Sequence, residues 1–232
     1  IFIRFFGSGP SIAETFKAAE EEISLYKIED MQPITEPWTM EYNCDWKSIV
    51  DIDSEGYHVP MGHKDLHDLV GRSYCDQVLN DQVSRSCGNI DAGRHKSQLN
   101  QDYANTLPQE SYLPTSHQRE WIYWSTFPGF VITLFPDQIE IYHSYPISFQ
   151  KCAMAGRSYA LVDDRPEMKS AREYNRKINI SVGQEDVQLV KWSAEGMRSS
   201  AFNGAIMSDL EVGTCAFHNQ LRRSVPVTSL EL

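Results

Sequence analysis

Two histidines and a nearby acid lie close together in the segment Glu55–His63, which reads Glu-Gly-Tyr-His-Val-Pro-Met-Gly-His. His58 and His63 are five residues apart, and Glu55 precedes His58 by three. Two neutral imidazoles with one carboxylate from elsewhere in the chain can hold one face of a non-haem Fe(II) ion and leave positions open for oxygen and substrate. The segment therefore indicates a metal site whose third ligand comes from another element.

The spacing of the two histidines requires a bend in the backbone. In a regular helix, which advances about 100° per residue, they would diverge by about 140°. Pro60 and Gly62 lie between them, and a proline inside a helix removes a hydrogen bond and kinks the chain. We therefore expect a kink that turns His63 back toward His58. Glu55 shares a helical face with His58, so it is expected beside the ligands rather than among them.

A long helical pattern from Pro166 to Met197 offers the third ligand. Apolar or small residues lie within about 60° of Asp186 on a helical wheel, namely Val182, Leu189, Val190, Ser193 and Met197. Asp186 is thus expected on the buried face, where a carboxylate needs a partner or a metal ion. Glu185 lies off that face and is the weaker candidate.

Each of these signals also has an ordinary structural interpretation. Histidines around a proline are often core or surface residues, and Asp186 is equally suited to cap a neighbouring helix or to pair with an arginine such as Arg222. Zinc is the alternative metal, because two histidines and one acid with an open position also describe a hydrolytic zinc site. No His-Glu-x-x-His motif accompanies them, however. Spacing alone leaves these alternatives open.

The composition limits the class of protein. A chain of 232 residues with 41% hydrophobic and 11% aromatic residues can form one domain with a substantial core. A net charge of −11 without a Lys/Arg-rich run argues against nucleic acid or an anionic membrane surface as a partner. No apolar run reaches the roughly 20 residues of a membrane span. The five cysteines lack CxxC, CxH and CxxH pairings, which is typical of reduced thiols in the cytoplasm.

The pattern of elements favours an α+β domain. Strands are expected at 38–42, 121–124, 130–135 and 138–145, and helices at 11–26, 166–197 and 208–223, with Ser208 and Glu211 as a capping box. The polar, aperiodic residues 75–118 are expected to form a long irregular excursion that covers a site. Strands clustered in mid-chain beside long helices predict an antiparallel sheet wrapped around a helix.

The motifs together resemble a known family. Asp45-Trp46-Lys47, then Asp51, then Glu55 through His63 are similar to the signature of the Rieske-type non-haem iron ring-hydroxylating oxygenases, in the catalytic domain of their α subunit. Further similarities to one branch of the family are Pro-Asp-Gln at 136–138, Glu185-Asp186 ten residues before Gly196, and Phe217-His218 with Arg222. The chain departs from the pattern at Asp45, where Asn is usual, and at Ile52-Asp53, where Asn-Tyr or Asn-Phe is usual.

The resemblance implies a helix-grip fold of the START or Bet v 1 type, with a curved antiparallel sheet around a long C-terminal helix. It makes His58, His63 and Asp186 the ligands of one mononuclear Fe(2+), and Glu55 the acid that bridges toward the electron-donating cluster. The CxH and CxxH motifs of the [2Fe–2S] Rieske centre are missing. We therefore expect residues 1–232 to be the catalytic domain, with residues 1–9 as the tail of a preceding Rieske domain.

The same resemblance implies a cytoplasmic terminal oxygenase that hydroxylates, or oxidatively demethylates, a small aromatic or quaternary-amine substrate with O2. Electrons would pass from NAD(P)H through a reductase, with or without a ferredoxin, to a Rieske cluster of the neighbouring subunit in a homotrimer. The alternative is a metal-free helix-grip domain that binds an apolar ligand or a partner.

Two further groups of residues bear on the substrate. The aromatic residues of the predicted strands either line a pocket or, more often at this spacing, form core: Trp121, Tyr123, Trp124, Phe127, Phe130, Tyr142 and Tyr145. His218 and Arg222 lie one turn apart and either bind a substrate carboxylate or pair structurally. We favour the structural interpretation.

Overall fold

The structure is a computed structural model that describes residues 9–71, 73–80, 82–204 and 206–225. The strand expected over residues 1–9 therefore lies almost wholly outside the described residues. Among the described residues, none of the helices combines the length and the apolar character that a membrane span needs.

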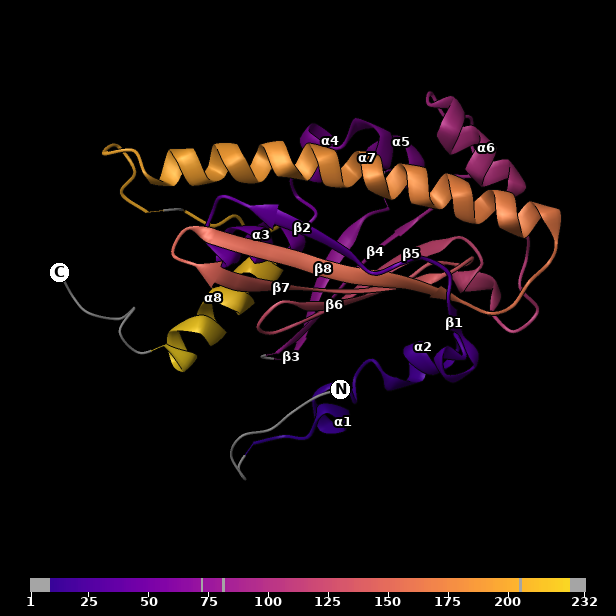
Figure 1. The fold of residues 1–232 in the computed structure, drawn as a ribbon, viewed down its shortest axis with the longest axis horizontal. Helices are drawn as coiled ribbons and strands as arrows, with labels where there is room; N and C mark the ends of the chain where they lie inside the picture. Colours follow the sequence, from indigo (N-terminus) through magenta and orange to yellow (C-terminus); the bar gives the residue numbers. More distant parts are fainter. Residues whose placement is uncertain (1–8, 72, 81, 205, 226–232) are drawn as a thin grey trace.

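An eight-stranded antiparallel sheet forms the central layer (Figure 1). The strands are β1 (Gln32–Pro33), β2 (Trp38–Tyr42), β3 (Cys75–Asn80), β4 (Val83–Asn89), β5 (Glu120–Thr126), β6 (Phe130–Leu134), β7 (Ile139–Ser148) and β8 (Lys151–Ala160). Their order is β1-β8-β7-β6-β5-β4-β3, and β2 also pairs with β8. Strands β5 to β8 follow one another through short turns, which explains why each pairs with its neighbour in sequence.

Helix α7 (Pro166–Met197) runs along one face of the sheet, with Pro166 at its first turn where a missing N–H costs nothing. Helices α4 (Val59–Gly62), α5 (Lys64–Val70) and α6 (Gln98–Thr106) lie beside it (Figure 1). Helices α1 (Ile12–Thr15) and α2 (Glu20–Ser24) and the 3-10 turn η1 (Ile28–Asp30) lie on the other side. The remaining helical elements are α3 (Trp46–Asp53), η2 (Thr115–His117) and α8 (Val212–Ser224).

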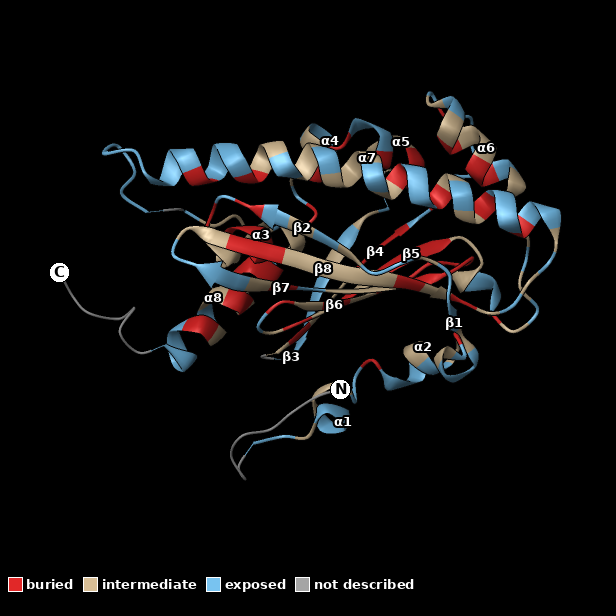
Figure 2. Cartoon of the chain, viewed as in Figure 1, coloured by how far each residue is buried: buried red, intermediate tan, exposed pale blue. Residues whose placement is uncertain are grey.

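Strand β5 shows how the sheet serves two cores, since alternate side chains of a strand point to opposite faces. Trp121 packs toward α7 with Phe135 and Ile178. Ile122 and Trp124 face the other way, in a cluster that also contains Ala19 and Tyr26 of the N-terminal segment. Figure 2 shows buried residues along the side of α7 that faces the sheet and exposed residues along its outer side.

The expected α+β, helix-grip architecture is confirmed, and the predicted bounds of β2 and α7 match those of the structure. The prediction of an irregular excursion at residues 75–118 was wrong, because this region contains β3, β4, α6 and η2. Strand β3 is an edge strand whose residues are mostly exposed, so its sequence lacks the apolar alternation that identifies a half-buried strand.

Two helix boundaries also differ from the prediction. The helix expected over residues 11–26 is broken into α1 and α2, with turn residues between them. The last helix begins at Val212 rather than at Ser208. The Glu211 carboxylate does accept a hydrogen bond from the Ser208 backbone N–H, but this contact closes a turn before the helix and does not start it.

Candidate metal centre

The two histidines lie at the ends of the short helix α4. His58 caps its start, Pro60 occupies its first turn, and His63 leaves the helical conformation with φ −122° and ψ 77° before α5 begins. Pro60 therefore starts a helix instead of kinking one, and the predicted bend occurs at His63. Gly62 allows α4 to approach α7, since a Cβ there would lie 2.8 Å from Leu189 Cδ1. The bend and the close approach together aim both imidazoles at α7.

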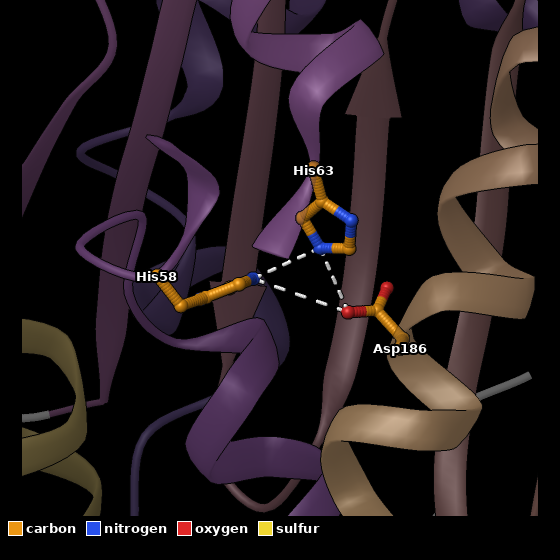
Figure 3. Close-up of side chains that lie close together, drawn as sticks. All are labelled: His58, His63 and Asp186. Atoms are coloured by element: carbon orange, nitrogen blue, oxygen red, sulfur yellow. Dashed lines mark hydrogen bonds and ion pairs between the residues drawn. The ribbon is translucent and has the colours of Figure 1, made fainter. Parts of the chain in front are cut away.

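The three predicted ligands converge on one point (Figure 3). The Nε2 atoms of His58 and His63 are 3.1 Å apart. Asp186 Oδ1, on α7, lies 2.9 Å from Nε2 of His63 and 3.9 Å from Nε2 of His58. His63 is 1% exposed. Three atoms bound to one ion at about 2.1 Å, at right-angled to tetrahedral angles, would be about 3.0 to 3.4 Å apart. The 3.1 and 2.9 Å separations that involve His63 are close to this range, whereas the 3.9 Å separation between His58 and Asp186 is longer, so a shared ion would draw these two side chains together.

A carboxylate holds the outer nitrogen of each imidazole. Glu55 Oε1 lies 2.6 Å from Nδ1 of His58, and its Oε2 accepts the His58 backbone N–H at 3.0 Å. Glu185 Oε2 lies 2.9 Å from Nδ1 of His63. An ionised carboxylate only accepts hydrogen bonds, so each Nδ1 donates to its carboxylate and each ring directs its Nε2 toward the centre. Outer carboxylates of this kind orient histidines at metal sites.

The two Nε2 atoms and Asp186 Oδ1 consequently face one another. Asp186 Oδ1 is buried and has no hydrogen-bond partner among the described residues, although His63 Nε2 is only 2.9 Å away. Burial opposes protonation of His63, but Asp186 and Glu185 outweigh it and raise the pKa of this imidazole. The site therefore attracts positive charge. Two imidazoles and one carboxylate with open positions are the donor set of a non-haem iron centre, and the residues present fit such an ion.

The pairing of Asp186 with an arginine is not found among the described residues. Arg222 is exposed on α8 and donates to Asn219 Oδ1 at 3.3 Å instead. His218, its neighbour by one turn, contacts Asp51 Oδ1 through Nε2 at 2.8 Å and so connects α8 to α3. This contact agrees with the structural interpretation of His218.

A cavity of about 760 Å³ opens beside the three ligands. Its wall near them is aromatic and acidic: Trp38, Tyr42, Asp53, Tyr123, Glu140 and Tyr142. Asp53 faces the cavity but is shielded from bulk solvent, and this burial, together with the charge of Asp186, raises the pKa of Asp53 to about 8. Burial also raises the pKa of Glu140. The wall therefore holds acids that a bound cation would ionise, whereas Lys169, Arg172 and Arg176 line the cavity nearer the start of α7.

The aromatic residues singled out from the sequence divide between the two predicted roles. Trp121 and Trp124 are fully buried core residues, whereas Tyr123 and Tyr142 line the cavity. The sequence reasoning did not single out Trp38 or Asp53 as cavity residues, and it passed over Glu185 as a partner of His63. Glu185 was passed over because a helical wheel identifies the buried face of a helix but not how far a long side chain extends.

The model of the family described as "Ring hydroxylating alpha subunit (catalytic domain)" matches residues 30–226. The chain belongs to this family. The matched range contains every element that carries the metal centre, from α3 to α7. The search of curated protein sequences found no match to this chain.

Solved structures share the fold of this catalytic domain. The quaternary ammonium Rieske monooxygenase described in connection with carnitine oxidation by gut microbiota is 18% identical with a TM-score of 0.70, over 94% of this chain and 57% of that one. Naphthalene 1,2-dioxygenase from Rhodococcus sp., bound to indole, is 13% identical with a TM-score of 0.63, over 97% and 64%. Dicamba monooxygenase bound to dicamba is 13% identical with a TM-score of 0.52, over 84% and 59%. The chain thus spans less than two thirds of the length of each of these proteins.

Proposed function

We propose that this catalytic domain is the terminal oxygenase component of a Rieske-type system, with one Fe(2+) held by His58, His63 and Asp186. The observation that carries the proposal is the triangle of potential ligand atoms at 2.9 to 3.9 Å, in which Asp186 Oδ1 has no hydrogen-bond partner among the described residues. Bound iron would supply the activation of O2. The chain would supply the three ligands and a cavity beside them in which substrate would displace water.

Glu55 is proposed as the residue that couples this centre to its electron donor. Its carboxylate contacts both the ring and the backbone N–H of His58, and its side chain is 10% exposed. Tyr57 and Met61 beside it are 55% and 85% exposed, which leaves this edge accessible to a partner. We propose a [2Fe–2S] Rieske cluster outside residues 1–232 as that donor, in a neighbouring subunit of a homotrimer. Inter-subunit electron transfer is also described for the quaternary ammonium monooxygenase, which supports this arrangement.

The rest of the electron chain is proposed from the family alone: NAD(P)H, a separate reductase, and a ferredoxin where one is used. The five free cysteines support a cytoplasmic location for such a system. Residues 1–9 are proposed as the end of the Rieske domain.

The cavity favours a cationic substrate over a neutral aromatic one. Asp53 and Glu140 form no ion pair with any described residue; Asp53 contacts the Tyr142 hydroxyl at 3.4 Å, and Glu140 accepts the Trp38 indole N–H at 2.7 Å. Trp38 and Tyr142 lie with ring centroids 6.3 Å apart, and aromatic faces attract cations. We therefore propose hydroxylation or oxidative demethylation of a small quaternary amine. The structural neighbour that acts in carnitine oxidation supports the same class.

Metal binding is tested by loading the purified chain with Fe(II) under anaerobic conditions and adding nitric oxide. We expect about one iron per chain and the electron paramagnetic resonance signal of a non-haem iron nitrosyl. A chain that binds no metal would support the metal-free ligand-binding alternative. Preferential zinc binding without the nitrosyl signal would support a zinc hydrolase.

The substrate class is tested in the full-length protein with its reductase, by comparing oxygen consumption with betaine-like amines and with aromatic acids. We expect amines to stimulate consumption, and Asp53→Asn to raise KM for amines because it removes a carboxyl group that a bound cation would ionise. Stimulation by aromatic acids alone would contradict the cationic class and leave the iron site untouched.

A further inference from the structure

Four of the five cysteines lie in two close pairs outside the metal centre. The Sγ atoms of Cys75 and Cys87 are 3.3 Å apart, and those of Cys44 and Cys152 are 3.7 Å apart. Cys44 directly precedes, and Cys75 directly follows, the segment 45–74 that carries Glu55, His58 and His63. Each pair therefore joins one end of this segment to a strand of the sheet, β8 or β4.

The backbone around Cys75 and Cys87 suits a disulfide. The two residues are direct partners in the antiparallel β3–β4 ladder. Directly opposed residues of such a ladder have Cα atoms about 4.5 to 5.5 Å apart, which lies within the roughly 4.4 to 6.8 Å that disulfides span. The register of the ladder therefore already places the two cysteines within reach of a bond, with Sγ atoms 3.3 Å apart.

The two pairs differ in their access to an oxidant. Cys75 is exposed on the edge strand, whereas Cys87 is buried, and burial with the neighbouring Cys75 thiol raises the pKa of Cys87 to about 12. Cys75 is therefore the thiol that meets a dissolved oxidant first. Cys44 and Cys152 are 2% and 0% exposed, so both members of that pair are shielded.

The strand that carries Cys75 also contacts the turn that carries Glu55. Asp76, the next residue, accepts the Gly56 backbone N–H through Oδ2 at 2.7 Å. Tyr74, the preceding residue, packs directly against Gly56, where a Cβ would lie 1.7 Å from Tyr74 Cε1. Because alternate residues of a strand point to opposite faces, Tyr74 and Asp76 hold the turn while Cys75 faces Cys87.

We propose that Cys75 and Cys87 are a peroxide-responsive modification site. Their oxidation to a cross-strand disulfide fixes β3, the strand whose neighbouring side chains contact the Glu55–His58 turn. The Cys75 thiolate attacks hydrogen peroxide, the O–O bond breaks, and a sulfenic acid and hydroxide form. The hydroxide takes the proton of Cys87, and the resulting thiolate attacks that sulfur, so that the S–S bond forms, the S–O bond breaks and hydroxide leaves, to be neutralised by the proton that Cys75 released. In sum, two thiols and one peroxide give one disulfide and two waters. The site goes beyond the proposed oxygenase function and does not depend on iron.

The test treats the full metal-free chain, in the presence of a chelator, with graded hydrogen peroxide, then alkylates the remaining thiols and maps the peptides by mass spectrometry. We expect a linked Cys75–Cys87 peptide, with Cys44, Cys152 and Cys215 still alkylated. Cys87→Ser should abolish the intramolecular link, and the matched control Cys215→Ser should retain it. Oxidation of Cys44–Cys152 at the same peroxide concentration, or over-oxidation of Cys75 without a link, would overturn the proposed site.

The effect of the disulfide on the Glu55–His58 turn is measured in the same samples by hydrogen exchange. Exchange at the Gly56 amide, which is hydrogen-bonded to Asp76, should be slower by about tenfold in the oxidised chain, because fixing β3 to β4 suppresses local opening. Unchanged exchange in a fully oxidised sample would overturn the proposed connection between the disulfide and the turn. The Cys75→Ser variant treated with peroxide provides the baseline.

Discussion

Two clusters of histidine and carboxylate groups have the composition of a metal site, but they differ in which group neutralises the negative charge of their carboxylates. His58, His63 and Asp186 form one cluster, and Glu22, His117 and Glu120 form the other; in each, three potential ligand atoms lie within 4.8 Å of one another. In the second cluster, Arg85 Nη2 lies 2.7 Å from Glu22 and 2.9 Å from Glu120. In the first, Asp186 Oδ1 has no hydrogen-bond partner among the described residues.

We infer that an unsatisfied acceptor, rather than the types of ligand, distinguishes the proposed metal centre from the ion-pair network. Both carboxylate oxygens of Glu22 are bonded, since Arg85 also donates through Nε at 2.9 Å and the Trp124 indole N–H donates at 2.7 Å. Burial alone would raise the pKa of Glu22, yet Arg85, His117 and Trp124 outweigh it and lower the pKa. A guanidinium thus occupies the place that a metal ion would take.

The largest contrast is expected when a histidine is removed from each cluster. His63→Ala should abolish iron binding, a loss well beyond the roughly 10–100-fold that outer partners contribute to metal affinity. His117→Ala should leave the iron content unchanged. Iron per chain after anaerobic loading measures both. Equal losses in the two variants would remove the distinction between the clusters.

Removing the Arg85 guanidinium should lower the stability of the fold and leave iron binding unchanged, in contrast to His63→Ala. Arg85→Met leaves Glu22 and Glu120 partly buried without their counter-charge, so the free energy of unfolding should fall by about 3 kcal/mol, with iron per folded chain unchanged. Urea denaturation provides the measurement. The matched control is Arg176→Met, whose partner Glu173 is about as exposed as Arg176 itself and which should cost less than about 1 kcal/mol. Similar losses for both arginines would contradict the network interpretation.

The outer carboxylates of the metal centre should have a smaller effect on iron. Glu185→Ala should weaken Fe(II) affinity by about tenfold, because His63 loses the partner that fixes its ring, while Glu195→Ala, an exposed acid on the same helix, should not. A competition titration with a chelator measures the affinity, and an effect of Glu195→Ala as large as that of Glu185→Ala would count against this role.

The Glu55→Ala variant should differ from Glu185→Ala and Glu195→Ala in its effect on activity. It should retain iron at saturating Fe(II) but lose oxygen consumption in the full-length enzyme, because Glu55 contacts His58 at the edge proposed for electron entry. Iron content and reductase-driven oxygen uptake are measured in the same preparation. Normal uptake in this variant would separate Glu55 from electron delivery.

The smallest effect concerns pH and the second cluster. The folded-state pKa of Glu22 is lowered from 4.5, so its contribution to stability is fully present above the unfolded value and is lost as the pH falls through the folded value. The stability difference between the wild type and Glu22→Gln should therefore be constant near neutrality and shrink below about pH 4.5. Denaturation midpoints across this range test it, and a difference that does not vary with pH would refute the ion-pair account of Glu22.

The sequence was sufficient to predict elements whose pattern is set by burial. The 32-residue α7 and the placement of Asp186 on its inner side followed from helical periodicity, and β2 from its alternating residues. The edge strand β3 was not predicted because most of its residues are exposed. The bend at His63 was predicted from Pro60 but occurs three residues later, where α4 meets Leu189 of α7.

Contacts between distant segments could not be predicted from periodicity. Glu185 reaches His63 across 122 positions of sequence, and Trp38 reaches Glu140 across 102. The proximity of Cys75 to Cys87 depends on the register of β3 against β4, and no local pattern fixes this register when most residues of the strand are exposed.

The central claim is that the unsatisfied cluster holds the iron. Anomalous diffraction at the iron edge, from crystals of the chain loaded anaerobically with Fe(II), tests it most directly. The account predicts one peak between Nε2 of His58, Nε2 of His63 and Oδ1 of Asp186, and none at Glu22, His117 and Glu120. A peak at the second cluster, or no peak between the two histidines and Asp186, would contradict it.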